Sequence, residues 1–150
     1  MKVIGILGDI GSGKSFVSKQ FKCPVFNADA EVNKIYKKNK KCYKEIKKKL
    51  PKYIKSFPIS KIEISRAILA NNSNLKKIVR IVHPIVKKRM NIFFKGNVKK
   101  KMVVLDIPLL IENNLNNKKH ILIFVDSKKE QINLRLKRRK NYNKKIIESF

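Results

Sequence analysis

Short apolar runs alternate along the chain with longer stretches in which apolar residues recur at helical spacing. Val3–Gly8 is continuously apolar and rich in β-branched residues, which is typical of a strand buried on both faces of a parallel sheet. Three more segments predict strands: Pro24–Asn27, Met102–Ile107 and Ile121–Val125. Strands that alternate with helices predict βαβ units, and therefore an α/β fold with a parallel sheet flanked by helices.

The helical spacing predicts five helical stretches, Lys14–Phe21, Ala30–Leu50, Ile62–Leu69, Leu75–Phe94 and Glu130–Ser149. Ala30–Leu50 is expected to form one lysine-rich helix that buries Val32, Ile35, Tyr36, Tyr43 and Ile46. Pro84 is expected early in its helix or at a break between two helices. The last stretch is expected to break near Asn141–Asn143. Loops are expected between Pro51 and Pro58 and over Asn113–Lys119.

The composition of the chain indicates the size of the domain, its net charge and its cellular compartment. The 150 residues are the length of one domain, and 43% hydrophobic residues are enough for a core. A net charge of +28 favours a polyanionic partner. The alternative is that an A+T-rich coding sequence has enriched lysine on solvated faces of the protein, without selection for such a partner. Cys23 and Cys42 form no disulfide framework or metal motif, and no apolar run is long enough for a signal peptide or a membrane span. We therefore expect a soluble, cytoplasmic protein without a membrane partner.

Gly8-Asp9-Ile10-Gly11-Ser12-Gly13-Lys14-Ser15 matches the phosphate-binding pattern GxxxxGK[ST] between a predicted strand and a predicted helix. Glycines let successive backbone N–H groups turn toward phosphate oxygens, and the start of the helix adds its positive end. Lys14 is expected at the β- and γ-phosphates, the Ser15 hydroxyl at Mg²⁺, and the Phe16 backbone N–H near the α-phosphate. The bulk of Phe16 is tolerable if its ring packs inward. The predicted nucleotide-binding residues are Gly8, Gly11, Ser12, Gly13, Lys14, Ser15 and Phe16.

A phosphate loop alone names no substrate, because the fold serves kinases, GTPases and motors alike. The chain is too short for the extra domains of helicases, and it has no NKxD-type base-reading motif of GTPases. Small nucleotide and metabolite kinases remain, in which a mobile lid brings arginines to the phosphoryl group. Arg135 and Arg139 are four residues apart on the last predicted helix and suit that task, although surface charge on a basic helix is the alternative.

Several separated segments together resemble the dephospho-CoA kinase family, over essentially all 150 residues. They are the phosphate loop, Phe26-Asn27-Ala28-Asp29-Ala30, Arg66-Ala67-Ile68-Leu69 with His83-Pro84, Val104–Glu112 with its Asp-Ile-Pro-Leu-Leu-Ile-Glu segment, Phe124-Val125-Asp126, and the Arg135/Arg139 pair. The resemblance implies ATP-dependent phosphorylation of the ribose 3′-hydroxyl of dephospho-CoA, with Mg²⁺. It also implies a single P-loop kinase domain over 1–150, with a helical CoA-binding subdomain at about 60–95 and a lid at about 128–150.

The resemblance also implies roles for single residues. Asp29, Lys14 and Arg139 would be the catalytic residues, with Asp29 as the base. The alternative for Asp29 is that it only caps the N-terminus of the helix that follows. Asp106 would hold a Mg²⁺-bound water together with Ser15, or merely cap the segment after it. The substrate contacts implied are Arg66, Glu112 and His83, the last with a packed, satisfied core histidine as its alternative.

The chain departs from the family pattern at three places. Asn27 replaces the first aspartate of the family's Asp-Ala-Asp segment, and Phe16 replaces a common threonine after the loop serine. Family members also continue for about one helix–strand–helix stretch past the lid helix, so a shortened C-terminal end is expected. The alternatives left open are another small P-loop kinase, an inactive member of the family, and a basic nucleic-acid-binding protein. The oligomeric state is left open too.

Overall fold

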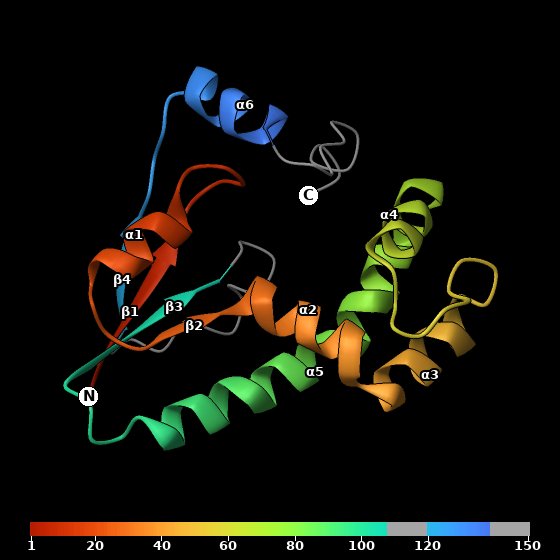
Figure 1. The fold of residues 1–150 in the computed structure, drawn as a ribbon, viewed down its shortest axis with the longest axis horizontal. Helices are drawn as coiled ribbons and strands as arrows, with labels where there is room; N and C mark the ends of the chain where they lie inside the picture. The colour runs from red at the N-terminus through yellow and green to blue at the C-terminus, as the bar shows by residue number, and fades with distance from the viewer. Residues whose placement is uncertain (108–119, 139–150) are drawn as a thin grey trace. The chain divides into compact units, whose positions relative to one another are not determined.

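The structure is a computed structural model that describes residues 1–107 and 120–138. Its elements are β1 (Lys2–Leu7), α1 (Lys14–Gln20), β2 (Val25–Asn27), α2 (Ala28–Lys38), α3 (Lys40–Lys49), α4 (Lys61–Ala70), α5 (Ser73–Gly96), β3 (Met102–Asp106), β4 (His120–Phe124) and α6 (Lys129–Lys137) (Figure 1). The described residues divide into two compact units. Residues 1–29, 90–107 and 120–138 form the sheet unit, and residues 30–89 form the helical unit.

The sheet unit is built on four parallel strands in the order β2-β3-β1-β4. Asp106 pairs in register with Ile6 on one side and with Asn27 on the other, while Leu7 pairs with Phe124. The carboxyl ends of all four strands therefore meet at one edge of the sheet. The predicted α/β fold with a parallel sheet is confirmed.

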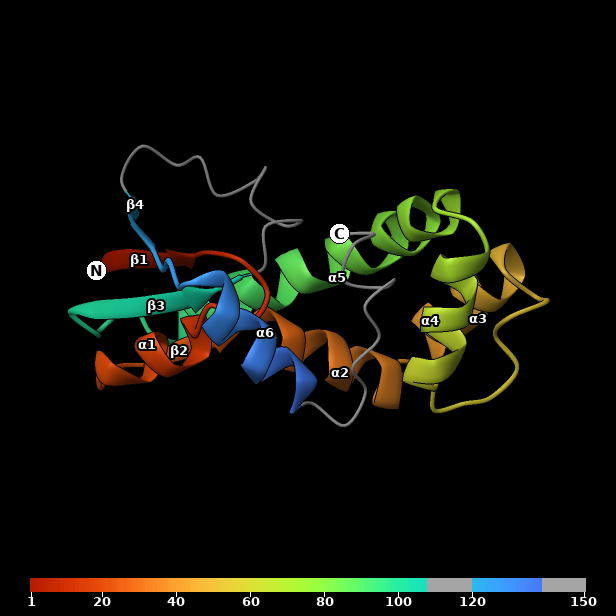
Figure 2. The same cartoon turned by 90° about the horizontal axis from the view of Figure 1, so that it is seen from above.

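The sheet forms because its central strands are almost wholly apolar. Ile4, Ile6 and Val104 make a buried cluster, and Val17 of α1 and Phe21, the residue after α1, pack against it. Figure 2 shows α1 beside β1 and β3, on one face of the sheet. This packing fixes the beginning of α1 next to the end of β1, where the phosphate loop lies.

The helical unit has a separate core of mainly branched aliphatic side chains. Ile35, Cys42, Ile46 and Ile54 are completely buried. The predicted single helix Ala30–Leu50 is wrong, because α2 and α3 are separated at Asn39. Asn39 has an extended backbone, and its side chain accepts a hydrogen bond from the Cys42 backbone N–H over 2.9 Å. Asparagine is a favoured N-cap residue, so it starts a new helix here.

The predicted position of Pro84, early in its helix or at a break between two helices, is also wrong. Pro84 lies in the middle of α5, which begins at Ser73 and continues to Gly96 without a break. A proline at this position removes one helical hydrogen bond, to the carbonyl of Arg80, and the rest of the long helix persists around it. Among the residues described, no helix combines the length and the apolar character needed to cross a lipid bilayer.

Candidate nucleotide-binding site

The phosphate loop connects β1 to α1 and depends on three glycines with positive φ. These are Gly8 (139°), Gly11 (90°) and Gly13 (105°). A Cβ on Gly8 would lie 2.3 Å from the Val125 carbonyl oxygen, so the loop passes too close to the end of β4 for any side chain. On Gly11, a Cβ would lie within 3.2 Å of Ile132 and Leu136 of α6. The glycine spacing of the motif is therefore required by backbone conformation and by close packing.

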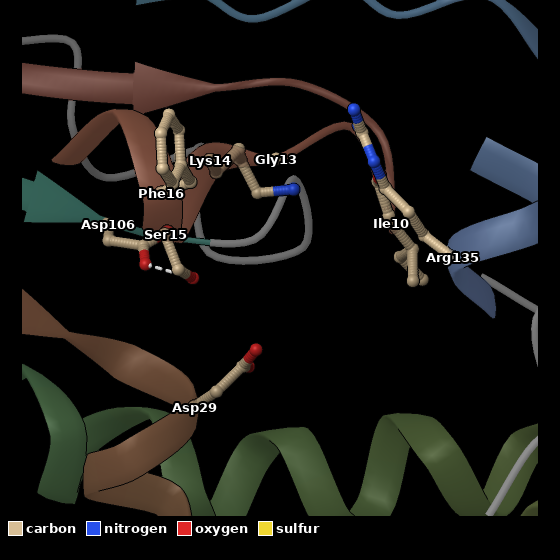
Figure 3. Close-up of a pocket in the computed structure, with 9 residues that line it drawn as sticks. Ile10, Gly13, Lys14, Ser15, Phe16, Asp29, Asp106 and Arg135 are labelled. Atoms are coloured by element: carbon tan, nitrogen blue, oxygen red, sulfur yellow. Dashed lines mark hydrogen bonds between the residues drawn. The ribbon is translucent and has the colours of Figure 1, made fainter. Parts of the chain in front are cut away.

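Several backbone carbonyls of the loop accept hydrogen bonds from side chains. Lys14 Nζ donates to the Gly8 oxygen over 2.6 Å and to the Asp9 oxygen over 2.8 Å. Arg135 Nη1 donates to the oxygens of Gly11 (3.2 Å) and Ser12 (3.0 Å). Figure 3 shows Arg135 reaching from α6 to the loop. The structure thus brings the predicted lid arginine and the loop lysine to the same loop.

A buried carboxylate lies directly beside the start of α1. Asp106 is 4% exposed, and its Oδ2 accepts hydrogen bonds from Ser15 Oγ over 2.7 Å and from Asn27 Nδ2 over 2.6 Å. An aspartate at position 27 would place a second negative charge there, whereas the amide of Asn27 donates a hydrogen bond. The departure at Asn27 therefore adds a donor to Asp106.

The Ser15–Asp106 pair suits a small divalent cation. A hydroxyl and a carboxylate are the hard oxygen ligands that Mg²⁺ prefers, and Mg²⁺ usually takes only one or two protein ligands beside phosphate oxygens and water. In the described parts of the chain, no group of three or more His, Cys, Asp or Glu side chains makes an all-protein metal cage. These two oxygen donors could hold such a cation together with a phosphate ligand.

One pocket joins these features to Asp29. It is lined by the loop and the start of α1, by Asp29 and Asp106, and by Arg135, in full Ile10, Gly11, Gly13, Lys14, Ser15, Phe16, Asp29, Asp106 and Arg135. Figure 3 shows the Asp29 carboxylate pointing into the space in front of Ser15 and Lys14. Helix α2 begins at Ala28, so Asp29 lies within its first turn and is not its N-cap. The capping alternative is therefore wrong.

The Phe16 side chain, directly after the loop serine, is exposed. This side chain is 71% exposed, so the ring does not pack inward, which was the condition for tolerating its bulk. It follows Ser15 in the first turn of α1, and the face of that helix toward the sheet is taken by Val17 and Phe21. Phe16 is nevertheless one of the residues that line the pocket.

The remaining predicted residues lie elsewhere. Arg66 is exposed on α4 and His83 lies in α5, both in the helical unit. The His83 Nε2 is buried and has no hydrogen-bond partner among the described residues. Glu112 and Arg139 lie outside the described residues.

The sequence analysis missed Ser127, which lies between the end of β4 and α6. Its Oγ donates to the Ser12 carbonyl oxygen over 2.7 Å and accepts a hydrogen bond from Arg135 Nη1 over 3.2 Å. Only its place just after a predicted strand hinted at this site, because strand ends of a parallel sheet meet at one edge.

A glycine loop between a central parallel strand and a helix, with Lys14, Ser15 and a buried aspartate on the neighbouring strand, defines a P-loop nucleotide-binding protein. Comparison with known proteins points to a more specific class than the P-loop site alone. The family model for dephospho-CoA kinase matches residues 2–150. The chain belongs to the dephospho-CoA kinase family, and the resemblance inferred from the sequence is confirmed.

Individual relatives of the chain are also dephospho-CoA kinases. The chain is 33% identical over 128 residues to the dephospho-CoA kinase of Wolbachia sp. subsp. Brugia malayi (strain TRS), which covers 82% of this chain and 66% of that protein. It is 31% identical over 132 residues to the dephospho-CoA kinase of Bartonella quintana (strain Toulouse), covering 85% of this chain and 67% of that protein. The chain thus spans about two thirds of the length of these curated relatives.

A solved structure supports the same fold. The crystal structure of TT1252 from Thermus thermophilus superimposes with a TM-score of 0.74 at 26% sequence identity. The superposition covers 99% of this chain and 77% of the other.

Proposed function

We propose that this chain transfers the γ-phosphoryl group of ATP to the ribose 3′-hydroxyl of dephospho-CoA, giving CoA and ADP. Membership of the dephospho-CoA kinase family supports the reaction. The observation that carries it in this chain is the pocket that joins the phosphate loop to the Asp29 carboxylate. A donor site and a base for an acceptor hydroxyl are the two parts that phosphoryl transfer to an alcohol needs.

ATP would bind through its phosphates. The backbone N–H groups of Gly11, Ser12, Gly13 and Phe16, together with the N-terminal end of α1, would hold the phosphate oxygens. Lys14 would exchange its carbonyl partners for the β- and γ-phosphates. Arg135 on α6 would likewise exchange its carbonyl partners for these phosphates. We also assign Arg139 to the transferring phosphoryl group, as the second arginine of the lid at about 128–150.

Asp29 would act on the acceptor. The 3′-oxygen forms a bond to the γ-phosphorus while the bond from that phosphorus to the β,γ-bridging oxygen breaks, leaving ADP. Asp29 would orient the 3′-hydroxyl and accept its proton. Its exposed position on the first turn of α2 leaves the carboxylate accessible to an incoming hydroxyl.

Ser15 and Asp106 would hold Mg²⁺, Ser15 directly and Asp106 through a water. The ion supplies charge neutralisation for the phosphates when it is bound. Asp106 is already aligned for this role by Ser15 and Asn27. The hydrogen bond from Asn27 keeps this carboxylate oriented when the Ser15 hydroxyl turns to the metal.

The acceptor would be gripped by the helical subdomain at about 60–95. Arg66 presents an exposed guanidinium, whose planar fork suits a pyrophosphate group. We assign His83 and Glu112 to the same substrate. The two free cysteines favour a cytoplasmic location, where thiols stay reduced.

Purified protein incubated with Mg-ATP and dephospho-CoA tests this proposal through ADP formation. We expect turnover by the wild type and a loss of about 100-fold or more in Lys14→Ala and in Asp29→Asn, because each removes a group that acts on the reacting atoms. Lys19→Ala on the same helix and Glu45→Gln on α3 are matched exposed controls that should retain full rate. Turnover of a nucleoside monophosphate or shikimate, but not of dephospho-CoA, would refute the proposed acceptor.

A further inference from the structure

The turn between β4 and α6 reaches back to the phosphate loop through one serine hydroxyl. Ser127 Oγ donates to the Ser12 carbonyl oxygen over 2.7 Å. The same oxygen atom of Ser127 accepts a hydrogen bond from Arg135 Nη1 over 3.2 Å. A hydroxyl donates one hydrogen bond and accepts others, so a single serine can connect the loop and the arginine at once.

The bond to the Ser12 carbonyl also controls a backbone donor of the loop. The Ser12 C=O and the Gly13 N–H belong to one planar trans peptide unit, in which the two groups point in opposite directions. A donor that holds the carbonyl on one side therefore fixes the N–H on the other. Gly13 has a φ of 105° and no Cβ, so its own conformational preference fixes this peptide only weakly.

Among the described residues, the other side chains that donate hydrogen bonds to carbonyls of this loop are cations. Lys14 bonds the Gly8 and Asp9 oxygens, and Arg135 bonds the Gly11 and Ser12 oxygens. Under the proposed function, both cations turn to phosphate oxygens when the nucleotide binds. The Ser127 hydroxyl carries no charge and has no comparable attraction to phosphate, so its bond to Ser12 can persist in the bound state.

We infer that Ser127 is a positioning residue of the nucleotide site. It holds the Ser12–Gly13 peptide with its N–H toward the phosphates after Lys14 and Arg135 have left the loop carbonyls. This inference rests on the proposed function only for nucleotide binding. The identity of the acceptor does not enter it.

Binding of ADP to Ser127→Ala and Ser127→Thr, measured by titration calorimetry, tests the inference. We expect about tenfold weaker ADP binding in Ser127→Ala, the size of one net hydrogen bond in a binding site. Ser127→Thr keeps the hydroxyl and should restore the affinity. Ser73→Ala removes an exposed hydroxyl in the helical unit and should leave ADP binding unchanged.

Kinetics separate positioning from general stability. In Ser127→Ala, the KM for ATP should rise with the Kd, while kcat, the KM for the acceptor and the melting temperature stay close to wild type. Unchanged ADP affinity in Ser127→Ala, or no recovery in Ser127→Thr, overturns the inference, and so does wild-type protein that binds no ADP. Weaker ADP binding in Ser127→Ala, together with no dephospho-CoA turnover by the wild type, would refute the acceptor alone and leave the role of Ser127 standing.

Discussion

The site edge of the sheet unit and the interior of the helical unit are stabilised by different interactions. In the sheet unit, the edge that carries the site is polar: loop carbonyls bond Lys14, Arg135 and Ser127, and the buried Asp106 bonds Ser15. In the helical unit, the buried side chains are mainly aliphatic, and most lysines are exposed. Directional hydrogen bonds fix the position of atoms, whereas apolar burial supplies free energy without fixing direction.

This contrast predicts that substitutions in the two units have different consequences. Polar substitutions at the sheet edge should change nucleotide binding more than folding. Truncations in the helical core should change folding more than nucleotide binding.

Ile46→Ala is the strongest test of the helical unit. Ile46 of α3 is completely buried, so truncation removes transfer free energy and leaves a cavity. We expect a loss of about 3 kcal/mol in the free energy of unfolding, measured by urea denaturation followed by circular dichroism. Leu69→Ala on α4, at a side chain that is 44% exposed, is the matched control and should cost well under half as much.

The same variant also tests the separation of the units. ADP affinity of Ile46→Ala, measured in the absence of urea, should stay within about twofold of wild type as long as the protein remains folded. A large loss of affinity in the folded variant would show that the helical core positions the phosphate loop, against the contrast drawn here.

Asp106→Asn is the corresponding test of the sheet unit. The substitution keeps the shape of the side chain but removes the charge that would hold a Mg²⁺-bound water. We expect turnover to fall about 100-fold, and the increase in ADP affinity on adding Mg²⁺ to disappear, because groups that orient a metal typically contribute this much. Titration calorimetry with and without Mg²⁺ measures the second effect directly.

Glu130→Gln is the control for Asp106→Asn, since this carboxylate is exposed on the first turn of α6 in the same unit. It should retain both the Mg²⁺ effect and the turnover. If Asp106→Asn kept its response to Mg²⁺, the metal would not depend on this carboxylate, and the pair with Ser15 would be structural.

The local features of this molecule follow from the sequence, and the long-range ones do not. The phosphate loop was predictable because the spacing of Gly8, Gly11 and Gly13 encodes a backbone conformation that needs no knowledge of the rest of the chain. The break at Asn39 was also encoded locally, in an N-cap residue, but the strong apolar periodicity on both sides concealed it.

Other site contacts depend on strand register. Asn27 meets Asp106 because β2 and β3 pair in parallel with these two residues opposite each other. Ser127 meets Ser12 across 115 positions of sequence because β4 pairs with β1. Periodicity predicts that strands exist, but it does not fix which strands are neighbours or in what register, so neither contact was accessible from the sequence.

The smallest predicted effect is a pH dependence that belongs to the helical unit. Burial alone would raise the pKa of Glu31, but hydrogen bonds and charges from Lys34 and Arg89 outweigh burial and lower it below 4.5. The pKa of Glu63 is also lowered from 4.5, because hydrogen bonds from Lys55, Ser56 and Ser60 outweigh burial. Both carboxylates therefore bind protons more weakly in the folded state than in the unfolded chain.

A lowered pKa contributes stability that is fully present above the unfolded value and is lost as the pH falls through the folded value. We expect the urea midpoint to decrease between about pH 5 and pH 3. The double variant Glu31→Gln/Glu63→Gln should be less stable than wild type at pH 7 and should show a flatter decrease, while Glu45→Gln, at an exposed carboxylate on α3, should keep the wild-type slope. An unchanged slope in the double variant would show that Glu31 and Glu63 do not set the acid sensitivity, against a pH dependence that belongs to these two carboxylates of the helical unit.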